Sequence, residues 1–161
     1  MPKKPTVIGA DLILKLYDLR REPEIRKARN WWLTQFWPES ADDILKISNS
    51  LGSQENNWMR QVGGYWEMAA SLALRGAIDT ELFLEPSFSG EMFFFYGKVH
   101  PFLKEIRDRM GNQRIFGNVE KLIASSEEAQ QFLKTTEERI AMRKKALSEA
   151  ARPDSALAKA S

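Results

Sequence analysis

The sequence predicts an all-α protein, an irregular bundle of about six to seven helices, and three observations support this class. Apolar residues recur at spacings of three and four through most of the 161-residue chain, without the alternation of a half-buried strand. Proline, glycine and capping residues divide these segments into helix-sized lengths. The 43% hydrophobic content suffices for one core, and no solenoid repeat occurs.

The segment from Trp58 to Arg75 is predicted to be the central helix, with Gly76 as its left-handed stop. One face of this helix carries Trp58, Val62, Tyr65, Trp66, Ala69, Leu72 and Ala73. Glu67 lies on the neighbouring face among small residues, and no cationic residue stands three or four positions away from it. If Glu67 is buried, we expect its partner to come from another helix.

Two helices are predicted ahead of this segment, after a loose arm at residues 1–8. They run from about Ala10 to Arg21 and from about Pro23 to Phe36. Trp31 points about 100° away from Trp32 in the second helix, so we expect one of the two to be partly exposed. A short third helix follows, with a capping arrangement of Ser40 and Asp43 and an end at Gly52.

The region after the central helix is predicted to contain a brief helix, a loop and a second major helix. The brief helix has the sequence ELFLE, and the loop is PSFSG at residues 86–90. From about Gly90 to Met110 helical spacing returns, although Pro101 lies in the middle. Because Gly97 stands four residues earlier and leaves room for the proline ring, we predict one kinked helix at Pro101.

The last third of the chain is predicted to hold a short apolar helix and a long polar one. The short helix covers residues 115–123, and the polar C-terminal helix runs from about Ser126 to Ala151. The predicted organisation is therefore a flexible arm at 1–8, a helical core domain at 9–125, the polar helix at 126–151 and a disordered tail at 152–161.

Composition narrows the class of protein. The chain has no cysteine, which excludes disulfides and thiolate metal sites and fits a reducing compartment. The net charge of +2 is spread evenly, so there is no strong nucleic-acid signal. No run of eighteen apolar residues and no export signal occur. We therefore expect a cytoplasmic protein without a transmembrane segment.

Motifs of common catalytic and cofactor sites are missing from the sequence. A single histidine excludes both the paired Glu-x-x-His sites of binuclear carboxylate bundles and the His-Glu-x-x-His site of zinc proteases. There is no phosphate-binding loop and no Gly-x-Ser-x-Gly elbow. We assign no catalytic residue, cofactor-binding residue or metal ligand, expect no cofactor, and lean towards a protein that is not an enzyme.

A resemblance to a known family rests on three stretches between residues 58 and 125: YWEMAASLALRGAIDTELF, GEMFFFYGKVHPFLKEIRDRMGN and IFGNVEKLIA. Together they resemble a bacterial family of small helical proteins known only as a domain of unknown function. The resemblance implies an all-α fold in a bacterial protein and implies no activity. It also implies that some members carry a membrane-spanning helix ahead of the domain, and this sequence shows no such helix.

A candidate site can be placed around Glu67, with Arg107, His100, Trp66 and Tyr96 as its other members. The structural interpretation is that Glu67 forms a buried ion pair or a hydrogen bond between helices, with Arg107, Arg75 or Arg29 as the partner. The functional interpretation is that Glu67 has a raised pKa and acts as a general acid or base. His100 is the only histidine, and lone histidines are more often structural than catalytic.

Three functions follow, in order. The first is a non-enzymatic module for protein–protein interaction or self-association, with the polar C-terminal helix as the connecting element. The alternative is a small-molecule-binding protein or cryptic enzyme, with Glu67 beside a pocket lined by Trp66 and Tyr96. The third is a weak nucleic-acid binder.

Overall fold

The computed structural model describes residues 4–152, and all of their regular structure is helical, which confirms the predicted class. The helices are α1 (Val7–Leu19), α2 (Pro23–Thr34), α3 (Ala41–Asn49), α4 (Gln54–Leu74), α5 (Thr80–Leu84), α6 (Pro86–Val99), the 3₁₀ turn η1 (His100–Phe102), α7 (Leu103–Met110), α8 (Gly117–Ala124) and α9 (Glu127–Ala150). Residues 1–3 of the predicted arm and 153–161 of the predicted tail lie outside the described residues. Among residues 4–152, no helix combines the length and apolar character needed to cross a bilayer.

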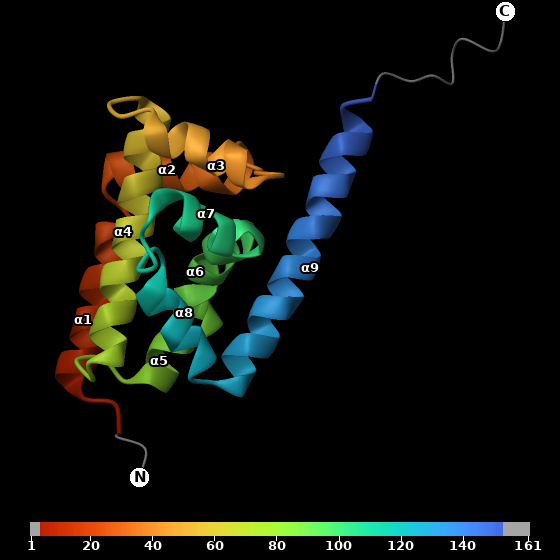
Figure 1. The fold of residues 1–161 in the computed structure, drawn as a ribbon. Helices are drawn as coiled ribbons and strands as arrows, with labels where there is room; N and C mark the ends of the chain where they lie inside the picture. The colour runs from red at the N-terminus through yellow and green to blue at the C-terminus, as the bar shows by residue number, and fades with distance from the viewer. Residues whose placement is uncertain (1–3, 153–161) are drawn as a thin grey trace, which may run out of the picture.

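Helix α4 is the centre of the bundle, as its periodicity predicts. Ser53 caps its start by accepting a hydrogen bond from the Asn56 amide at 3.1 Å. Its two faces pack against α2 and α8, so it joins the N-terminal and C-terminal parts of the domain (Figure 1). Any group on α4 between these faces is therefore held by both halves of the fold.

Two details of the N-terminal helices differ from the sequence prediction. Helix α1 begins at Val7 instead of Ala10, because the Thr6 hydroxyl accepts a hydrogen bond from the Gly9 amide at 3.0 Å and caps the helix. Trp31 and Trp32 are both buried, so the prediction that one is partly exposed was wrong. Because α2 has neighbours on two sides, Trp31 lies beside Trp58 of α4 and Trp32 packs on Phe95 of α6.

Helix α6 starts earlier than predicted, and the loop predicted for residues 86–90 was wrong. Pro86 occupies the first turn of α6, where its missing N–H costs no hydrogen bond. At Pro101 the chain stays helical but tightens into η1, so the predicted kink is a 3₁₀ turn between the two helices α6 and α7.

Helix α9 runs along one side of the bundle, and its C-terminal end continues past α3 (Figure 1). Its first part packs against α6 and α8 and buries Ala129, Leu133, Thr136 and Ile140. An ideal Cβ on Gly97 of α6 would lie only 3.0 Å from the Ile140 side chain. The glycine at 97 therefore permits the close approach of α9 to α6.

Candidate functional site

Glu67 caps the start of helix α8 with its carboxylate. It accepts hydrogen bonds from the backbone amides of Asn118 and Val119 at 3.0–3.2 Å. The first residue before α8, Phe116, provides no side-chain cap of its own, so a residue of α4 supplies the acceptor that the helix N-terminus needs. Of the two structural interpretations, the structure has the hydrogen bond between helices.

The arginines proposed as partners of Glu67 are engaged elsewhere. Arg107 of α7 forms a bidentate ion pair with Glu120 of α8, at 3.1 and 2.9 Å, and also donates to the Ile115 carbonyl. Arg29 pairs with Glu91, while Arg75 reaches only Ser71 on its own helix. Arg107 thus fastens α7 to the α7–α8 connection and does not neutralise Glu67.

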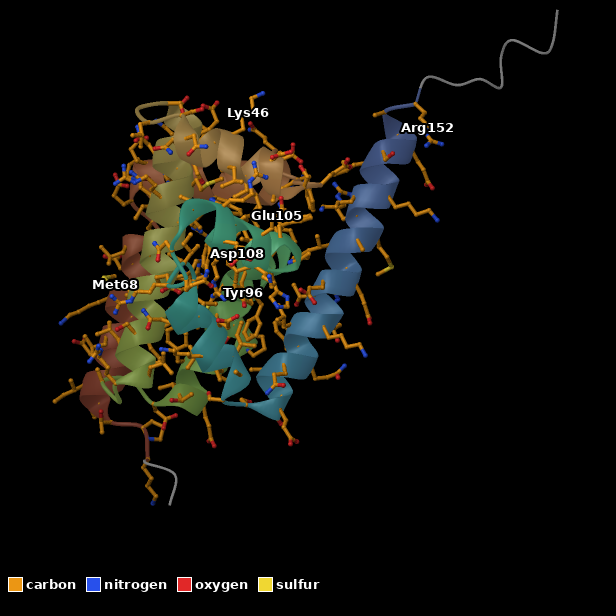
Figure 2. The ribbon with its side chains drawn as sticks, in the orientation of Figure 1. Lys46, Met68, Tyr96, Glu105, Asp108 and Arg152 are labelled. Atoms are coloured by element: carbon orange, nitrogen blue, oxygen red, sulfur yellow. The ribbon has the colours of Figure 1, made fainter. Side chains whose placement is uncertain are left out.

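His100 and Tyr96 lie together at the other side of α8. The rings stack with centroids 5.1 Å apart, and His100 Nδ1 lies 2.6 Å from the Glu137 carboxylate of α9. Figure 2 shows Tyr96 in the interior, where α6, α8 and α9 come together. Burial, aided by the nearby Glu120 carboxylate, raises the pKa of the Tyr96 hydroxyl. This arrangement attaches α9 to α6 through one exposed contact and one buried ring.

Trp66 points away from this cluster. It packs against Tyr65 and Phe88, with ring centroids at 4.9 and 5.9 Å, and the guanidinium of Arg20 lies over its ring. The space between Trp66 and Tyr96 is filled by side chains and leaves no room for a water molecule. In the described residues, the five candidate residues therefore do not line one open pocket.

A different hollow borders Glu67, and we call it the apolar groove. It has a volume of about 390 Å³ and lies between α3, α4, α7 and the α7–α8 connection. Its lining consists mostly of aliphatic and aromatic side chains: Trp32, Ile44, Ser48, Leu51, Asn56, Met59, Arg60, Gly63, Glu67, Val99, Ile106, Met110, Ile115 and Phe116. This size and lining are typical of small-molecule sites.

Two residues of the apolar groove carry buried polar atoms without a partner. Trp32 and Asn56 are each 1% exposed, and neither Trp32 Nε1 nor Asn56 Oδ1 has a hydrogen-bond partner within residues 4–152. The amide of Asn56 has a fixed orientation, because its Nδ2 donates to the carbonyls of Ile47 and Ser48 at 3.0 Å. The groove thus contains one unused donor and one unused acceptor, where most buried polar groups are paired.

Phe116 closes the inner edge of the apolar groove in a strained conformation. Its φ of 52° is left-handed, which is uncommon for a residue with a side chain. Gly63 lies beneath it, and a Cβ there would come within 3.4 Å of the Phe116 ring. Strained residues are found disproportionately at ligand sites.

The sequence analysis missed Lys98, which is 1% exposed in the middle of the aromatic run of α6. Its ammonium donates to the carbonyls of Trp32 and Phe36 at the end of α2 and lies 3.6 Å from the centre of the Trp37 ring. Burial, together with Lys144 nearby, lowers the pKa of Lys98 to about 7. A lone cation inside a run of phenylalanines was the signal that could have found it.

A second buried polar cluster joins α1, α2 and α6. Arg29 makes a bidentate pair with Glu91 and donates to the Arg20 carbonyl, while Arg20 lies over the rings of Tyr17 and Phe88. Arg20 Nη1 reaches Glu91 only at 3.9 Å. Because these groups are enclosed by core aromatics, their arrangement fits a role in holding three helices together.

An acidic groove lies at the opposite end of the molecule from the apolar groove. It has a volume of about 850 Å³ and runs between α5, the start of α6 and the start of α9. Phe93 and Phe132 are part of its lining, together with the four carboxylates of Glu81, Glu85, Glu127 and Glu128. The sequence analysis assigned the last two to a solvated helix and did not place them beside the first two.

One comparison with known proteins gave a match. The family model described as Domain of unknown function (DUF4760) matches residues 5–126, which span α1 to α8 and end one residue before α9. No curated protein and no solved structure matches the chain. Because the match covers most of the chain, the protein belongs to the DUF4760 family.

Proposed function

We propose that this protein is a non-enzymatic bacterial cytoplasmic interaction module that associates with a second copy of itself through α9. The observation that carries the proposal is the division of charge along this helix. Residues 127–138 contain four glutamates and one lysine, a formal charge of −3. Residues 139–152 contain five basic residues and one glutamate, a formal charge of +4.

The basic half of α9 is available for contact. After Ile140 the helix packs only lightly: Lys144 donates to the Pro38 carbonyl, and Leu147 is half-buried. The other residues from 141 to 152 are exposed, including Met142 at 65%. Arg152 stands at the free end of the described helix (Figure 2). A helix that extends beyond its own core with one sign of charge offers a surface for an acidic partner.

The acidic half of α9 lies in an environment of the same sign. Glu127 and Glu128 share the acidic groove with Glu81 and Glu85, and the phenylalanines of the groove add apolar surface between them. If two copies place their α9 helices antiparallel, the basic half of each lies against the acidic half and the acidic groove of the other. Such a pairing is self-complementary, as a two-fold dimer requires.

Sedimentation velocity at low and high salt tests this proposal. We expect the full chain to form a dimer at low salt and to dissociate as salt screens the charges. Reversing the basic half, with Arg143→Glu and Lys145→Glu, is expected to give a monomer, and so is reversing the acidic half, with Glu127→Lys and Glu128→Lys. An equimolar mixture of the two variants should form a heterodimer, because each then carries one sign along its whole α9 helix.

The matched control is Arg21→Glu with Arg26→Glu. These residues are exposed near the α1–α2 junction, and the change alters net charge by the same amount as the reversal of the basic half. This variant should associate as the unmodified chain does. A chain that is monomeric at low salt, or a mixture of the reversed variants that does not associate, would show that α9 is not a self-association surface.

A further inference from the structure

We propose that the apolar groove is a binding site for a neutral amphiphile, a molecule with an apolar body and one head group that both donates and accepts a hydrogen bond, such as an alcohol or a primary amide. The inference does not depend on self-association, because no residue of α9 lines this groove. It rests on three features of the lining: its apolar character, its two unpartnered polar atoms and its charge balance.

The apolar body is accommodated by the walls. Ile44, Val99, Ile106 and Ile115 come from four different parts of the chain and converge on the groove. Two further aliphatic residues at its rim, Leu51 and Met110, are 78% and 45% exposed. An apolar ligand in the groove would remove these side chains from water, and burial of apolar surface is the main driving force for binding in such sites.

The head group is specified by the two unpartnered atoms. Trp32 Nε1 can only donate, so it requires an acceptor on the ligand. Asn56 Oδ1 can only accept, because the nitrogen of the same amide is occupied by α3 carbonyls, so it requires a donor on the ligand. A hydroxyl or a primary amide supplies both from one position, and leaving either atom unpaired is unfavourable in a buried site.

The charge of the ligand follows from the other polar residues. Arg60 and Glu67 are the only charged residues in the lining of this groove, and their signs are opposite. The Glu67 carboxylate is already bound by the amides of Asn118 and Val119, so it is not free to pair with a cation. A charged head group beside the aliphatic walls would lose its hydration without a matching counter-charge, which favours a neutral ligand.

The test follows the indole N–H of Trp32 by two-dimensional NMR of the full chain, using four probes of the same length. They are 1-octanol, octanamide, octanoate and octylammonium. The five tryptophans give five indole signals, and Trp32→Phe identifies the one that belongs to Trp32. Octanol and octanamide are expected to shift that signal saturably, whereas the two charged probes should bind at least about tenfold more weakly.

Rim variants carry the test even if Trp32→Phe does not fold. Leu51→Asp and Met110→Asp change exposed side chains, so the fold should persist, and each should weaken octanamide binding by about tenfold. Met142→Asp makes the same kind of change on α9, at an exposed methionine away from the groove, and should leave binding unchanged.

Three results would overturn the proposal. The first is no saturable shift of the Trp32 indole with either neutral probe, which would mean that water alone satisfies this N–H. The second is equal binding of all four probes, which would mean that the head group is not read. The third is binding that Met142→Asp reduces as much as Leu51→Asp does, which would place the probe outside the groove. Since α9 charge reversal leaves the groove intact, failure of self-association and failure of ligand binding are separate results.

Discussion

Glu67 on α4 and Val119 on α8 are joined by a hydrogen bond of 3.0 Å from the Val119 amide to the Glu67 carboxylate. The same carboxylate accepts from Asn118, so one side chain of the central helix satisfies two of the amides at the start of α8. Helix α8 covers only eight residues and buries Val119, Leu122 and Ile123. A short helix of this kind depends on its cap and on packing more than on its own propensity.

Replacement of Glu67 should therefore weaken the contact between α4 and α8. Glu67→Ala is expected to lower the free energy of unfolding by about 1–2 kcal/mol, because the amides of Asn118 and Val119 lose their acceptor. Glu67→Gln keeps one acceptor oxygen and should lose less. Urea denaturation measures both. Glu67→Ala with unchanged stability would show that water replaces the carboxylate at no cost.

Lys98 should give the fold a dependence on pH. Because burial lowers its pKa to about 7 in the folded protein, from an ordinary value of 10.5, the unfolded state binds more protons between these two values. The contribution of Lys98 to stability is therefore most unfavourable below about pH 7 and improves as the pH rises. Between about pH 7 and about pH 9, we expect a gain of roughly 2 kcal/mol relative to the Lys98→Met variant.

The comparison with Lys98→Met removes the effects of other groups. Denaturation curves of both proteins, recorded below the ordinary tyrosine pKa of about 10, measure the difference directly. Burial raises the pKa of Tyr65 to about 12, so this residue stays protonated in that range in both proteins. Parallel pH profiles for the two proteins would mean that Lys98 keeps its proton inside the core, held by the Trp32 and Phe36 carbonyls and the Trp37 ring.

Gly97 should respond to substitution in a way that depends on Ile140. Alanine at 97 would bring a Cβ within 3.0 Å of Ile140 Cδ1, and overpacking of this kind costs about 1–3 kcal/mol. Ile140→Val removes that Cδ1 atom. Gly97→Ala should therefore destabilise the unmodified chain but stabilise the Ile140→Val background by about 0.5–1 kcal/mol, the ordinary gain of alanine over glycine in a helix.

A double-mutant cycle by chemical denaturation measures this coupling. Gly64→Ala is the matched control, since Gly64 is in the interior of α4 and a Cβ there meets no atom within 4 Å. That variant should be more stable by about 1 kcal/mol in either background. Additive effects of Gly97→Ala and Ile140→Val would contradict the close approach of α9 to α6.

Truncation should separate the two halves of α9. A chain that ends at Met142 keeps Leu133 and Ile140 on α6, so its melting temperature should match that of the full chain while its self-association is lost. A chain that ends at Ser126 keeps the predicted core at 9–125 and is expected to fold, but at a lower melting temperature, because it uncovers Phe93, which packs on Phe132 with ring centroids 4.8 Å apart. Calorimetry checks both. Equal melting temperatures for the two truncated chains would mean that α9 adds nothing to the core.

Features of the fold that depend on local sequence could be predicted. The central helix follows from the spacing of Trp58, Val62 and Tyr65, and the capping box of α3 follows from Ser40 and Asp43, whose reciprocal hydrogen bonds are present. Such signals involve residues within one turn of each other. Where a helix meets several neighbours, as α2 does, one face no longer decides burial, which is why Trp31 was predicted incorrectly.

The candidate site could be predicted only in part, because its geometry depends on contacts far apart in the sequence. Glu67 was singled out from the absence of a local cation, and the structure gives it partners 51 and 52 residues away. The apolar groove depends on where α3 and α7 lie relative to α4, which no spacing within a helix specifies. Asn56 could not be recognised, since its unused oxygen becomes visible only once its nitrogen is seen on α3.

The cap that α4 provides for α8 also has a consequence for the order of folding. A peptide that contains α8 alone carries no acceptor for its first amides, so this segment gains its helical start only after the central helix is in place. Synthesis from the N-terminus delivers Glu67 well before Val119, and the nascent chain thus holds a prepared docking point when α8 emerges.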